Sequence, residues 1–532
     1  MSFPEFVLER REEILSRTGE HLWLVAVSIL AAVIIGVPLG VLATRRPRLG
    51  RPLLAVAGIV QTIPSMALFG FLIPLPFLGG IGARTAIIAL VVYALLPVLQ
   101  GTFTGLKGVA PAIVEAGRGM GMTPRQLLLW VELPLALPVM MAGIRVAAVA
   151  SVGIATIAAA IGAGGLGTFI FRGVAMVDNR QILLGAVPAA AMAVVADLLL
   201  GVVERRLAPA ARPRRSPGMV AAAVIVAALA LAGAIHLLAP LYSARTGAAG
   251  ASGGGEGGAG TIVIGSKNFT EQVILGEILA TLIESSTELE VVRRFDLGGT
   301  FVCHKALLAG ELDLYVEYTG TALSAILESP PSTDAGAVYR MVREEYARRF
   351  DLVWLAPLGF NNTFALVVRS DDAGRLGLAR ISDLSKVADR YRAGFGYEFI
   401  ERADGYKGLA AAYGLHLKER PREMDLGLIY RALAERQVDV VAGNSTDGVI
   451  EPLGLVTLED DRHYFPPYDA APVARAETLR RHPQVGALLD ELAGRISEAR
   501  MRRMNFAGDS EHRSPHAIAV EFLSGEGLAR QP

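Results

Sequence analysis

The sequence has almost no cysteine, the residue that forms disulfide cross-links. It contains a single cysteine, Cys303, in 532 residues, which excludes an intrachain disulfide and any zinc site built from cysteines. The sequence also has no net charge, because 51 Lys and Arg balance 51 Asp and Glu. This balance gives no electrostatic reason to expect binding to nucleic acid.

Several motifs typical of enzymes are absent as well. No G-x-x-x-x-G-K-[ST] segment occurs, and the glycine cluster "GAGGLG" at residues 162–167 lacks the lysine of a phosphate-binding loop. Apart from "GASGG" (250–254) inside a glycine-rich low-complexity segment, no G-x-S-x-G string occurs, and no three of the eight histidines show metal-ligand spacing; His304 is expected near the start of a helix rather than as a base. The chain is therefore not expected to be an enzyme, and we expect no catalytic residue, no cofactor and no metal.

A signal peptide is not apparent at the amino terminus. The segment "MSFPEFVLERREEILSRTGEHL" is charged and amphipathic, and it has no short apolar core followed by a small-residue cleavage site. Residues 1–20 are predicted to be an amphipathic leader. The first export signal is then a retained transmembrane helix.

Apolar residues, in contrast, are abundant in one half of the chain. Hydrophobic residues make up 52% of the sequence and charged residues 19%, and residues 20–240 are mostly apolar with few acids. A membrane span needs about 20 mostly apolar residues. The sequence predicts six spans, at about 21–43, 52–74, 83–104, 136–161, 181–203 and 218–241.

Basic residues predict how these spans are oriented. Arginines crowd the segments "RRPRLGR" (45–51) and "ERRLAPAARPRR" (204–215), and short loops rich in Lys and Arg remain in the cytoplasm. The loop between the third and fourth spans then lies inside too. The amino terminus and everything after the sixth span are predicted to lie outside.

The long inside loop, "VEAGRGMGMTPRQLLLWVELPLALP" (114–138), carries the most specific signal. Gly121 permits a sharp turn between two short helices, and the apolar face of the second helix can sit in a groove on a partner. The loop resembles the "EAA…G…LP" motif with which ABC-importer permeases dock into their ATPase, and "AAAIGAGGLGTFIFRG" (158–173) resembles the same family. An ordinary interfacial amphipathic helix is the alternative. The resemblance covers about residues 20–205 and implies these coupling residues: Glu115, Ala116, Gly117, Gly121, Leu133 and Pro134.

This resemblance also implies an assembly. A transmembrane permease domain at 21–205 would work in the bacterial inner membrane with a second copy of the chain and two copies of a separate ABC ATPase subunit. Residues 206–243 are predicted to form a basic loop and an anchoring transmembrane helix. Residues 244–260 are predicted to be a glycine-rich linker that acts as a flexible tether. Such a tether keeps the following domain at a high local concentration beside the permease.

The remaining residues, 261–532, have the composition of a water-soluble domain. Strand-like and helix-like segments alternate with short loops, as in "TIVIGS", "EQVILGEILATLIE" and "DLYVEY", which is typical of α/β folds. We predict two lobes, about 261–360 with 465–532 and about 370–460. They would be joined by two crossings, one of them a long strand at 358–370. The ligand of a two-lobed binding protein lies in the cleft.

Six segments of this half resemble, in family order, the substrate-binding proteins for osmoprotectants such as glycine betaine, carnitine and choline. They are "GSKNFTEQ" (265–272), "YVEYTGTAL" (315–323), "GFNNTFAL" (359–366), "EFIERADGY" (398–406), "STDG" (445–448) and "YFPPYD" (464–469). The whole fold expected is thus an all-α polytopic permease domain followed by a two-lobed α/β domain of the periplasmic-binding-protein type, located outside the cytoplasm.

The resemblance implies a ligand site for a quaternary amine. A trimethylammonium group donates no hydrogen bond and is recognised by aromatic faces, whereas a carboxylate needs cationic or hydroxyl donors. The family's aromatic cage falls on Tyr318, Phe364 and Tyr468, with Asn444 where a tyrosine is usual. Its carboxylate donors fall on Lys267, Thr321 and Arg402. Taken one by one, the rings could instead belong to the core and Arg402 to a surface pair with Asp404, and Phe269 and Tyr397 are further candidates for the walls.

Two departures from the family pattern bear on the ligand. Phe364 has no phenolic hydroxyl, and Asn444 replaces a ring with an amide. A carboxylated betaine of the glycine betaine or carnitine type is expected, with a larger betaine such as ergothioneine as the alternative. A membrane-anchored ligand sensor is the alternative from another class, although no cytoplasmic output domain follows in the sequence.

Overall fold

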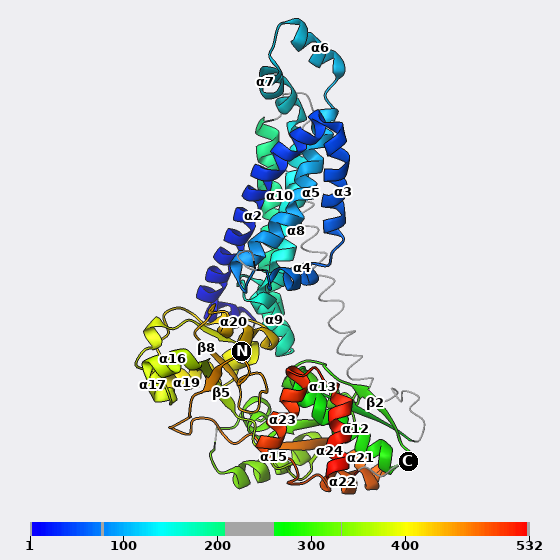
Figure 1. The fold of residues 1–532 in the computed structure, drawn as a ribbon, viewed down its shortest axis with the longest axis vertical. Coiled ribbons are helices and arrows are strands. Elements are labelled where there is room, and N and C mark those ends of the chain that lie inside the picture. The colour runs from blue at the N-terminus through cyan, green and yellow to red at the C-terminus, as the bar shows by residue number, and fades with distance from the viewer. Residues whose placement is uncertain (1–2, 76–78, 208–259, 331, 529–532) are drawn as a thin grey trace. The chain divides into compact units, whose positions relative to one another are not determined.

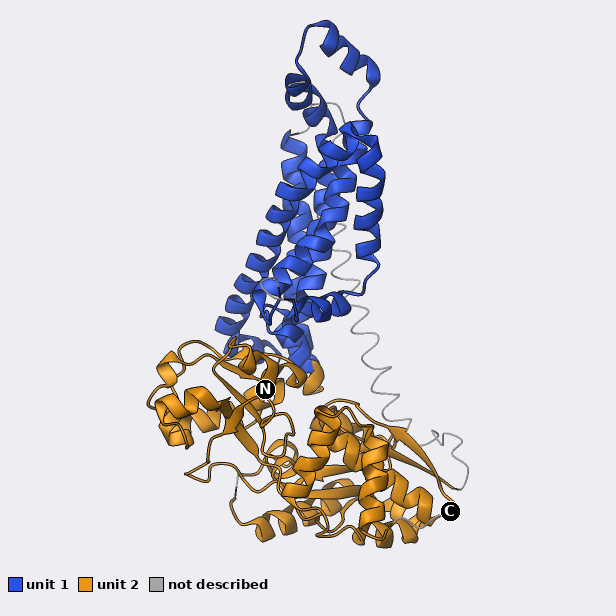
Figure 2. Cartoon of the chain, in the orientation of Figure 1, with its two compact units in different colours: residues 1–173, 179–239 blue, residues 174–178, 240–532 orange. Residues whose placement is uncertain are grey.

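The computed structural model describes residues 3–75, 79–207, 260–330 and 332–528. Two compact units make up the chain: residues 1–173 with 179–239, and residues 174–178 with 240–532 (Figure 2). The first unit is helical and the second contains two β-sheets (Figure 1). The predicted combination of an all-α domain and an α/β domain is confirmed.

Long apolar helices dominate the helical unit. Four segments of its described residues are long and apolar enough to cross a membrane, namely Arg11–Arg45, Ala83–Lys107, Pro124–Ile161 and Asn179–Leu207. The helices are α1 (Phe3–Glu9), α2 (Arg11–Arg45), α3 (Pro47–Gln61), α4 (Ser65–Leu72), α5 (Ala83–Lys107), α6 (Pro111–Gly119), α7 (Pro124–Leu127), η1 (Leu128–Glu132), α8 (Leu133–Ile157), η2 (Ala158–Ile161), α9 (Gly167–Ala175) and α10 (Asn179–Leu207).

Three expectations for this unit need correction or stay open. The leader is not separate from the first span, because α2 runs without a break from Arg11 to Arg45. The second span is not one continuous helix but a pair, α3 and α4, bent by 99°. Pro64 stands at this bend; it lacks an N–H group and disfavours helical backbone at the residue before it. The predicted sixth span and the linker lie outside the described residues.

Small residues bring the long helices of this unit close together. A Cβ on Gly36 of α2 would lie 2.9 Å from Val98 Cγ1 of α5, and one on Gly143 of α8 would lie 2.4 Å from the Pro97 carbonyl oxygen. Tight contact between small residues is a main source of helix association in membranes, where burial of apolar surface gives little. The helical unit is therefore packed in the way that membrane proteins are.

Two five-stranded sheets form the α/β unit. Lobe 1 has the strand order β2-β1-β3-β10-β4, and lobe 2 has the order β7-β6-β8-β5-β9. The strands are β1 (Thr261–Gly265), β2 (Glu290–Arg294), β3 (Leu314–Tyr318), β4 (Leu352–Trp354), β5 (Phe364–Arg369), β6 (Ala393–Phe395), β7 (Arg422–Glu423), β8 (Val440–Asn444), β9 (Leu455–Thr457) and β10 (Ala470–Arg475). In each sheet one strand, β10 or β5, pairs antiparallel with both of its neighbours.

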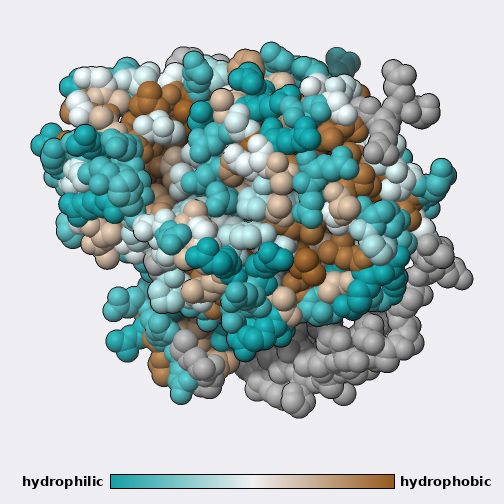
Figure 3. All heavy atoms as spheres, turned by 90° about the horizontal axis from the view of Figure 1, so that it is seen from below, coloured by the Kyte–Doolittle hydropathy of each residue, from teal (hydrophilic) through white to brown (hydrophobic). Residues whose placement is uncertain are grey.

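Helices and turns surround both sheets. They are α12 (Thr270–Ser286), α13 (Thr300–Leu308), α14 (Thr319–Thr321), η3 (Ala322–Ile326), α15 (Ala335–Phe350), α16 (Ser370–Leu376), α17 (Ile381–Leu384), η4 (Ala388–Arg390), α18 (Tyr397–Glu401), α19 (Tyr406–Tyr413), α20 (Leu426–Ala434), α21 (Ala476–Arg481), α22 (Pro483–Asp490), α23 (Glu498–Asp509) and α24 (Pro515–Gly525). Helix α12 shows why this half folds: Ile274, Leu275, Ile278, Leu279 and Ile283 are fully buried in the core. The surface drawn in Figure 3 is largely hydrophilic with scattered apolar patches, as is usual for a domain in water.

The chain passes between the lobes at residues 355–363 and 458–469. The two crossings touch through an antiparallel bridge between Asn361 and Asp469. The expected long strand at 358–370 is wrong in extent, since only Phe364–Arg369 is a strand. Gly359 interrupts it, because its φ of 114° lies outside the range that strands use.

Candidate functional site

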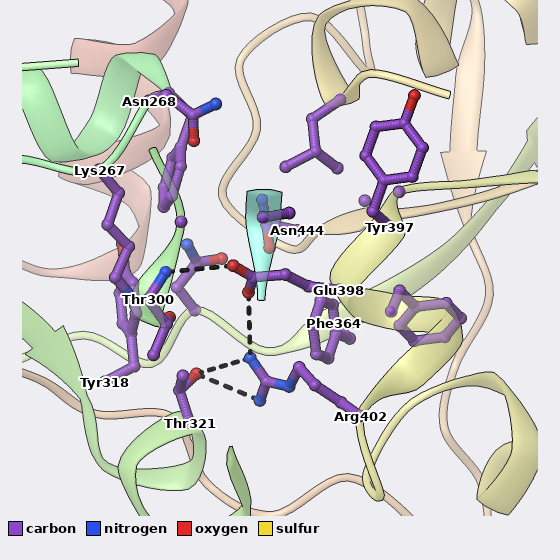
Figure 4. A pocket seen from close by; sticks show the side chains of 18 of the residues that line it. Lys267, Asn268, Thr300, Tyr318, Thr321, Phe364, Tyr397, Glu398, Arg402 and Asn444 are labelled. Carbon is purple, nitrogen blue, oxygen red and sulfur yellow. Dashed lines mark hydrogen bonds and ion pairs between the residues drawn. The ribbon is translucent and has the colours of Figure 1, made fainter. Parts of the chain in front are cut away.

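A cavity of about 120 Å³ lies in the cleft between the two lobes. Figure 4 shows it from close by, with Lys267, Tyr318 and Thr321 on the lobe 1 side and Phe364 and Arg402 on the lobe 2 side. All seven residues predicted from the sequence line this cavity: Lys267, Tyr318, Thr321, Phe364, Arg402, Asn444 and Tyr468. Phe269 and Tyr397, the two further candidates, line it as well.

Strand register explains why residues far apart in sequence meet here. Tyr318 is the last residue of β3 and is paired with Ala470 at the start of β10, so the chain brings Tyr468 next to it. In lobe 2, Phe364 at the start of β5 is paired with Asn444 at the end of β8. Both pairs stand at strand ends, where ligand sites of α/β sheets are found.

The aromatic rings of the site contact one another, Phe364 through edge-to-face pairs. The centroids of Phe364 and Tyr468 lie 5.6 Å apart with their planes at 76°, and those of Phe364 and Phe399 lie 4.9 Å apart at 65°. Phe269 stacks on Tyr318 with the centroids 6.4 Å apart. Phe399, which also lines the cavity, was not predicted; its spacing in "EFIER" does not distinguish it from a core residue.

Both basic residues are paired inside the protein. Lys267 Nζ lies 2.5 Å from Glu317 Oε1 and 4.8 Å from the centroid of the Tyr318 ring. Arg402 binds Asp404 through Nε at 2.9 Å and through one terminal nitrogen at 2.6 Å, and its guanidinium lies 4.9 Å from the centre of the Phe364 ring. The alternative that Arg402 and Asp404 form an ion pair on the protein surface is wrong, because both side chains are buried.

Several hydrogen bonds connect the lobes across the cavity. Arg402 donates to the hydroxyl of Thr321 at 3.3 Å, and the backbone N–H of Thr300 donates to Glu398 Oε1 at 3.1 Å (Figure 4). Thr300 begins helix α13, and the start of a helix favours a carboxylate. Burial raises the pKa of Glu398, although Arg402 and Lys267 oppose this. Glu398 and Thr300 were not predicted, because nothing local in the sequence shows that an acid will face a helix start in the other lobe.

A polar group stands at the fourth wall, where the amide of Asn444 is fixed from behind. Its backbone N–H donates to Asp447 Oδ2 at 2.9 Å, and its side-chain nitrogen lies 3.4 Å from the same carboxylate. Tyr430 also donates to Asp447. Gly443 makes room for this contact, since a Cβ there would lie 1.6 Å from the Tyr430 hydroxyl oxygen.

Each tyrosine of the predicted cage donates its phenol proton to a buried carboxylate. Tyr318 Oη lies 2.6 Å from Glu271 Oε1, and Tyr468 Oη lies 2.6 Å from Asp404 Oδ2. Burial works to raise the pKa of Asp404, but the charge and hydrogen bonds of Arg402 outweigh it and hold the pKa below its ordinary value. Burial raises the pKa of Glu271, against hydrogen bonds from Thr446, Tyr318 and Asn505.

The helical unit contains the predicted loop between α5 and α8. Gly121 has a φ of 81° between α6 and α7, a conformation that favours glycine. Glu115 and Ala116 are exposed, Gly117 is buried beside Leu127, and Leu133 and Pro134 begin α8. Large apolar side chains on this loop are exposed, among them Met120 at 72% and Trp130 at 66%.

Comparison with known proteins agrees with this architecture. The family profile "Binding-protein-dependent transport system inner membrane component" matches residues 36–213. The profile "Substrate binding domain of ABC-type glycine betaine transport system" matches residues 260–525. A bundle of membrane helices with a matching permease profile, joined to a two-lobed domain with a cleft, defines the subunit of an ABC importer.

Three relatives cover the chain or its halves. The ergothioneine transport permease/ergothioneine binding protein of Helicobacter pylori is 33% identical over 510 residues, 94% of this chain and 88% of that protein. A carnitine transport binding protein of Listeria monocytogenes is 38% identical over 49% of this chain and 86% of its own length. An osmoprotectant import permease protein of Salmonella typhimurium is 46% identical over 39% of this chain and 98% of its own length.

The chain belongs to the family of ABC-importer proteins in which a permease and a substrate-binding domain form one polypeptide. It is a transporter subunit and not an enzyme. A permease of this family is part of an ABC system with a partner ATPase, and it resides in the cell membrane.

Proposed function

We propose that this chain imports a zwitterionic quaternary amine, a carboxylated betaine, and that a separate ATPase subunit supplies the energy. One observation carries the proposal: the rings of Tyr318, Phe364 and Tyr468 and the basic groups of Lys267 and Arg402 line one cavity. Aromatic faces attract a quaternary ammonium. Basic side chains and a hydroxyl recognise a carboxylate.

The two ends of the ligand would be held by different groups. The trimethylammonium end lies against the rings, and the carboxylate end accepts hydrogen bonds from Arg402, Lys267 and the hydroxyl of Thr321. In the structure these donors contact one another or carboxylates: Arg402 contacts Thr321 at 3.3 Å and Lys267 contacts Glu317. The ligand carboxylate would therefore share its donors with Asp404 and Glu317.

A larger betaine is the second candidate. The polar wall made by Asn444 suits a ligand with a hydrogen-bonding group beyond its ammonium and carboxylate, and Glu398 adds an acceptor in the same cavity. The relative from Helicobacter pylori, which shares the fused arrangement, is named for ergothioneine. Ergothioneine has an imidazole-thione ring that would meet these groups.

The arrangement of the whole chain belongs to the proposal too. We infer a permease domain at 21–205, an anchoring helix within 206–243, a linker at 244–260 and a binding domain at 261–532 outside the cytoplasm. Lobe 1 would contain about 261–360 and 465–532, and lobe 2 about 370–460. Two copies of the chain and two ATPase subunits would form the importer, with Glu115, Ala116, Gly117, Gly121, Leu133 and Pro134 at the ATPase contact.

Calorimetric titration of the full chain in lipid nanodiscs tests the solute. The panel is glycine betaine, carnitine, ergothioneine and choline, with unmethylated glycine and histidine as controls. At least one carboxylated betaine should bind more tightly than choline, and the unmethylated amino acids should not bind. Choline binding most tightly would contradict the role of Lys267 and Arg402, and tighter binding of histidine than of ergothioneine would contradict the role of the rings.

A further inference from the structure

The acids behind the two cage tyrosines are buried and close. Glu271 and Asp404 are each 2% exposed, and both accept a phenol proton at 2.6 Å. This distance lies within the range for a hydrogen bond between a hydroxyl and a carboxyl group. Neither acid lines the cavity, so neither would touch a ligand directly.

Glu271 is held by neutral donors on every side that the described residues show. Besides Tyr318, it accepts hydrogen bonds from Asn362 at 2.8 Å, Thr446 at 2.5 Å and Asn505 at 2.9 Å. These groups come from the first crossing, from the turn after β8 and from helix α23. The carboxylate is thereby fixed behind the Tyr318 ring, and no basic partner among them cancels its charge.

The Tyr318 ring needs such support because a cation of the protein already lies against it. The Lys267 ammonium lies 4.8 Å from the centroid of the Tyr318 ring, and the Arg402 guanidinium lies 4.9 Å from that of Phe364. A cation on one face of a ring weakens the attraction that the negative quadrupole of the ring has for a second cation. A carboxylate that accepts the phenol proton polarises the ring in the opposite direction, and its charge acts strongly in a poorly solvated interior.

We propose that Glu271, acting through the Tyr318 hydroxyl, selects for positive charge in the head group of the ligand. Glu271 is thus a positioning and specificity-determining residue that lies outside the cavity. The inference rests on the proposed function, because it assumes that a quaternary ammonium occupies the cage.

An uncharged ligand of the same shape separates this role from a structural one. Glycine betaine and its carbon isostere 3,3-dimethylbutanoate differ only in the charge of the head group. Titrations use the full chain in nanodiscs, with the wild type and Glu271→Gln. We expect Glu271→Gln to weaken glycine betaine by about two- to thirtyfold, the range of one cation–π contact. The isostere should change less than twofold.

Two further variants guard against a general loss of structure. Tyr318→Phe keeps the ring and removes the hydroxyl. In this background, Glu271→Gln should reduce the binding free energy of glycine betaine by less than half as much as it does in the wild type. Glu423→Gln is the matched control, since Glu423 is also buried but its ion pair is with Arg420 at 3.9 Å. It should leave both ligands unaffected. If the wild type binds ergothioneine but not glycine betaine, the same variants are titrated with ergothioneine instead of glycine betaine.

The outcomes distinguish the inference from the function on which it rests. A wild type that prefers glycine betaine to its isostere, with the preference intact in Glu271→Gln, overturns the inference alone. Equal weakening of both ligands, or full additivity with Tyr318→Phe, shows a purely structural role and overturns it as well. A wild type that binds no quaternary amine overturns both the proposed function and the inference.

Discussion

Asn444 is the residue that most directly ties the structure to the choice of solute. Replacing it by tyrosine would supply the fourth ring of the cage, while the hydrogen bond from its backbone N–H to Asp447 would remain. One added cation–π contact is worth about 0.5–2 kcal/mol. Asn444→Tyr should therefore tighten the binding of glycine betaine by about two- to thirtyfold and weaken the binding of a bulkier betaine. Titration of both ligands measures the two affinities.

Asn444→Ala is the control for that substitution. It removes the amide without adding a ring, so it should not tighten glycine betaine. An unchanged ranking of betaines in Asn444→Tyr would mean that this side chain does not contact the ligand.

His304 provides a prediction about pH. It is buried on α13 against Tyr346 and Phe350, with ring centroids 5.4 and 5.0 Å away, and burial lowers its pKa from 6.5 to about 4. The folded state then binds fewer protons than the unfolded state between these values. The lowered pKa of His304 therefore makes a contribution to the free energy of unfolding that is present above pH 6.5. This contribution is lost as the pH falls toward 4, by roughly 3 kcal/mol in all.

The measurement is the free energy of unfolding of the α/β domain at several pH values between 7 and 4. His304→Leu should flatten the curve in this window, whatever it does to stability at pH 7. A curve with the same slope in the variant would show that His304 does not bind the protons concerned.

The cavity-lining residues could be predicted because their chemistry lies in ordered motifs. The rings and basic groups named from the sequence all line the cavity. Glu271, Glu398 and Asp404 were not predicted as part of the site, because a sequence does not reveal which acids are buried or which hydroxyl they meet. Their partners lie 47, 98 and 64 residues away in the chain.

At the scale of elements, the loop between α5 and α8 carries the clearest test. Valine at position 121 would be strained, because the φ of 81° is one that a β-branched residue rarely adopts. Gly121→Val should abolish uptake and leave ligand binding by the α/β domain unchanged, since the loop belongs to the other unit. Uptake in vesicles and titration of the same preparation give the two readings.

Gly119→Ala is the matched control for the loop. Gly119 ends α6, has no positive φ and leaves a Cβ free of neighbours within 4 Å, so this variant should transport normally. Normal uptake by a correctly inserted Gly121→Val protein would remove the case for the loop as the ATPase contact.

Element boundaries were harder to predict than element types. The charged residues 11–20 suggested a separate leader, yet one helix includes both these residues and the apolar residues that follow, with Gly19 inside it. Apolar composition indicated a span at 52–74, but composition alone does not show a bend of 99°. Alternating strand and helix patterns did predict the two-lobed unit, because buried strands and amphipathic helices have different periods.

At the scale of the whole molecule, the orientation of the chain is open to a direct test. A reporter that is active only in the cytoplasm should be silent when fused after Gly260. The same reporter fused after Gly119, in the predicted inside loop, should be active. Activity at Gly260 would contradict the placement of the binding domain outside and the assignment of the sixth span.

Uptake by the reconstituted importer decides whether the chain imports a quaternary amine with energy from a separate ATPase. The chain is purified together with its ATPase subunit, inserted into liposomes and given radiolabelled glycine betaine or ergothioneine. We expect one of them to accumulate only with ATP on the ATPase side, unlabelled betaine to compete, and vesicles with the chain alone to accumulate none. Accumulation without ATP or without the ATPase, or no uptake of any quaternary amine by an assembly that hydrolyses ATP, would contradict this expectation.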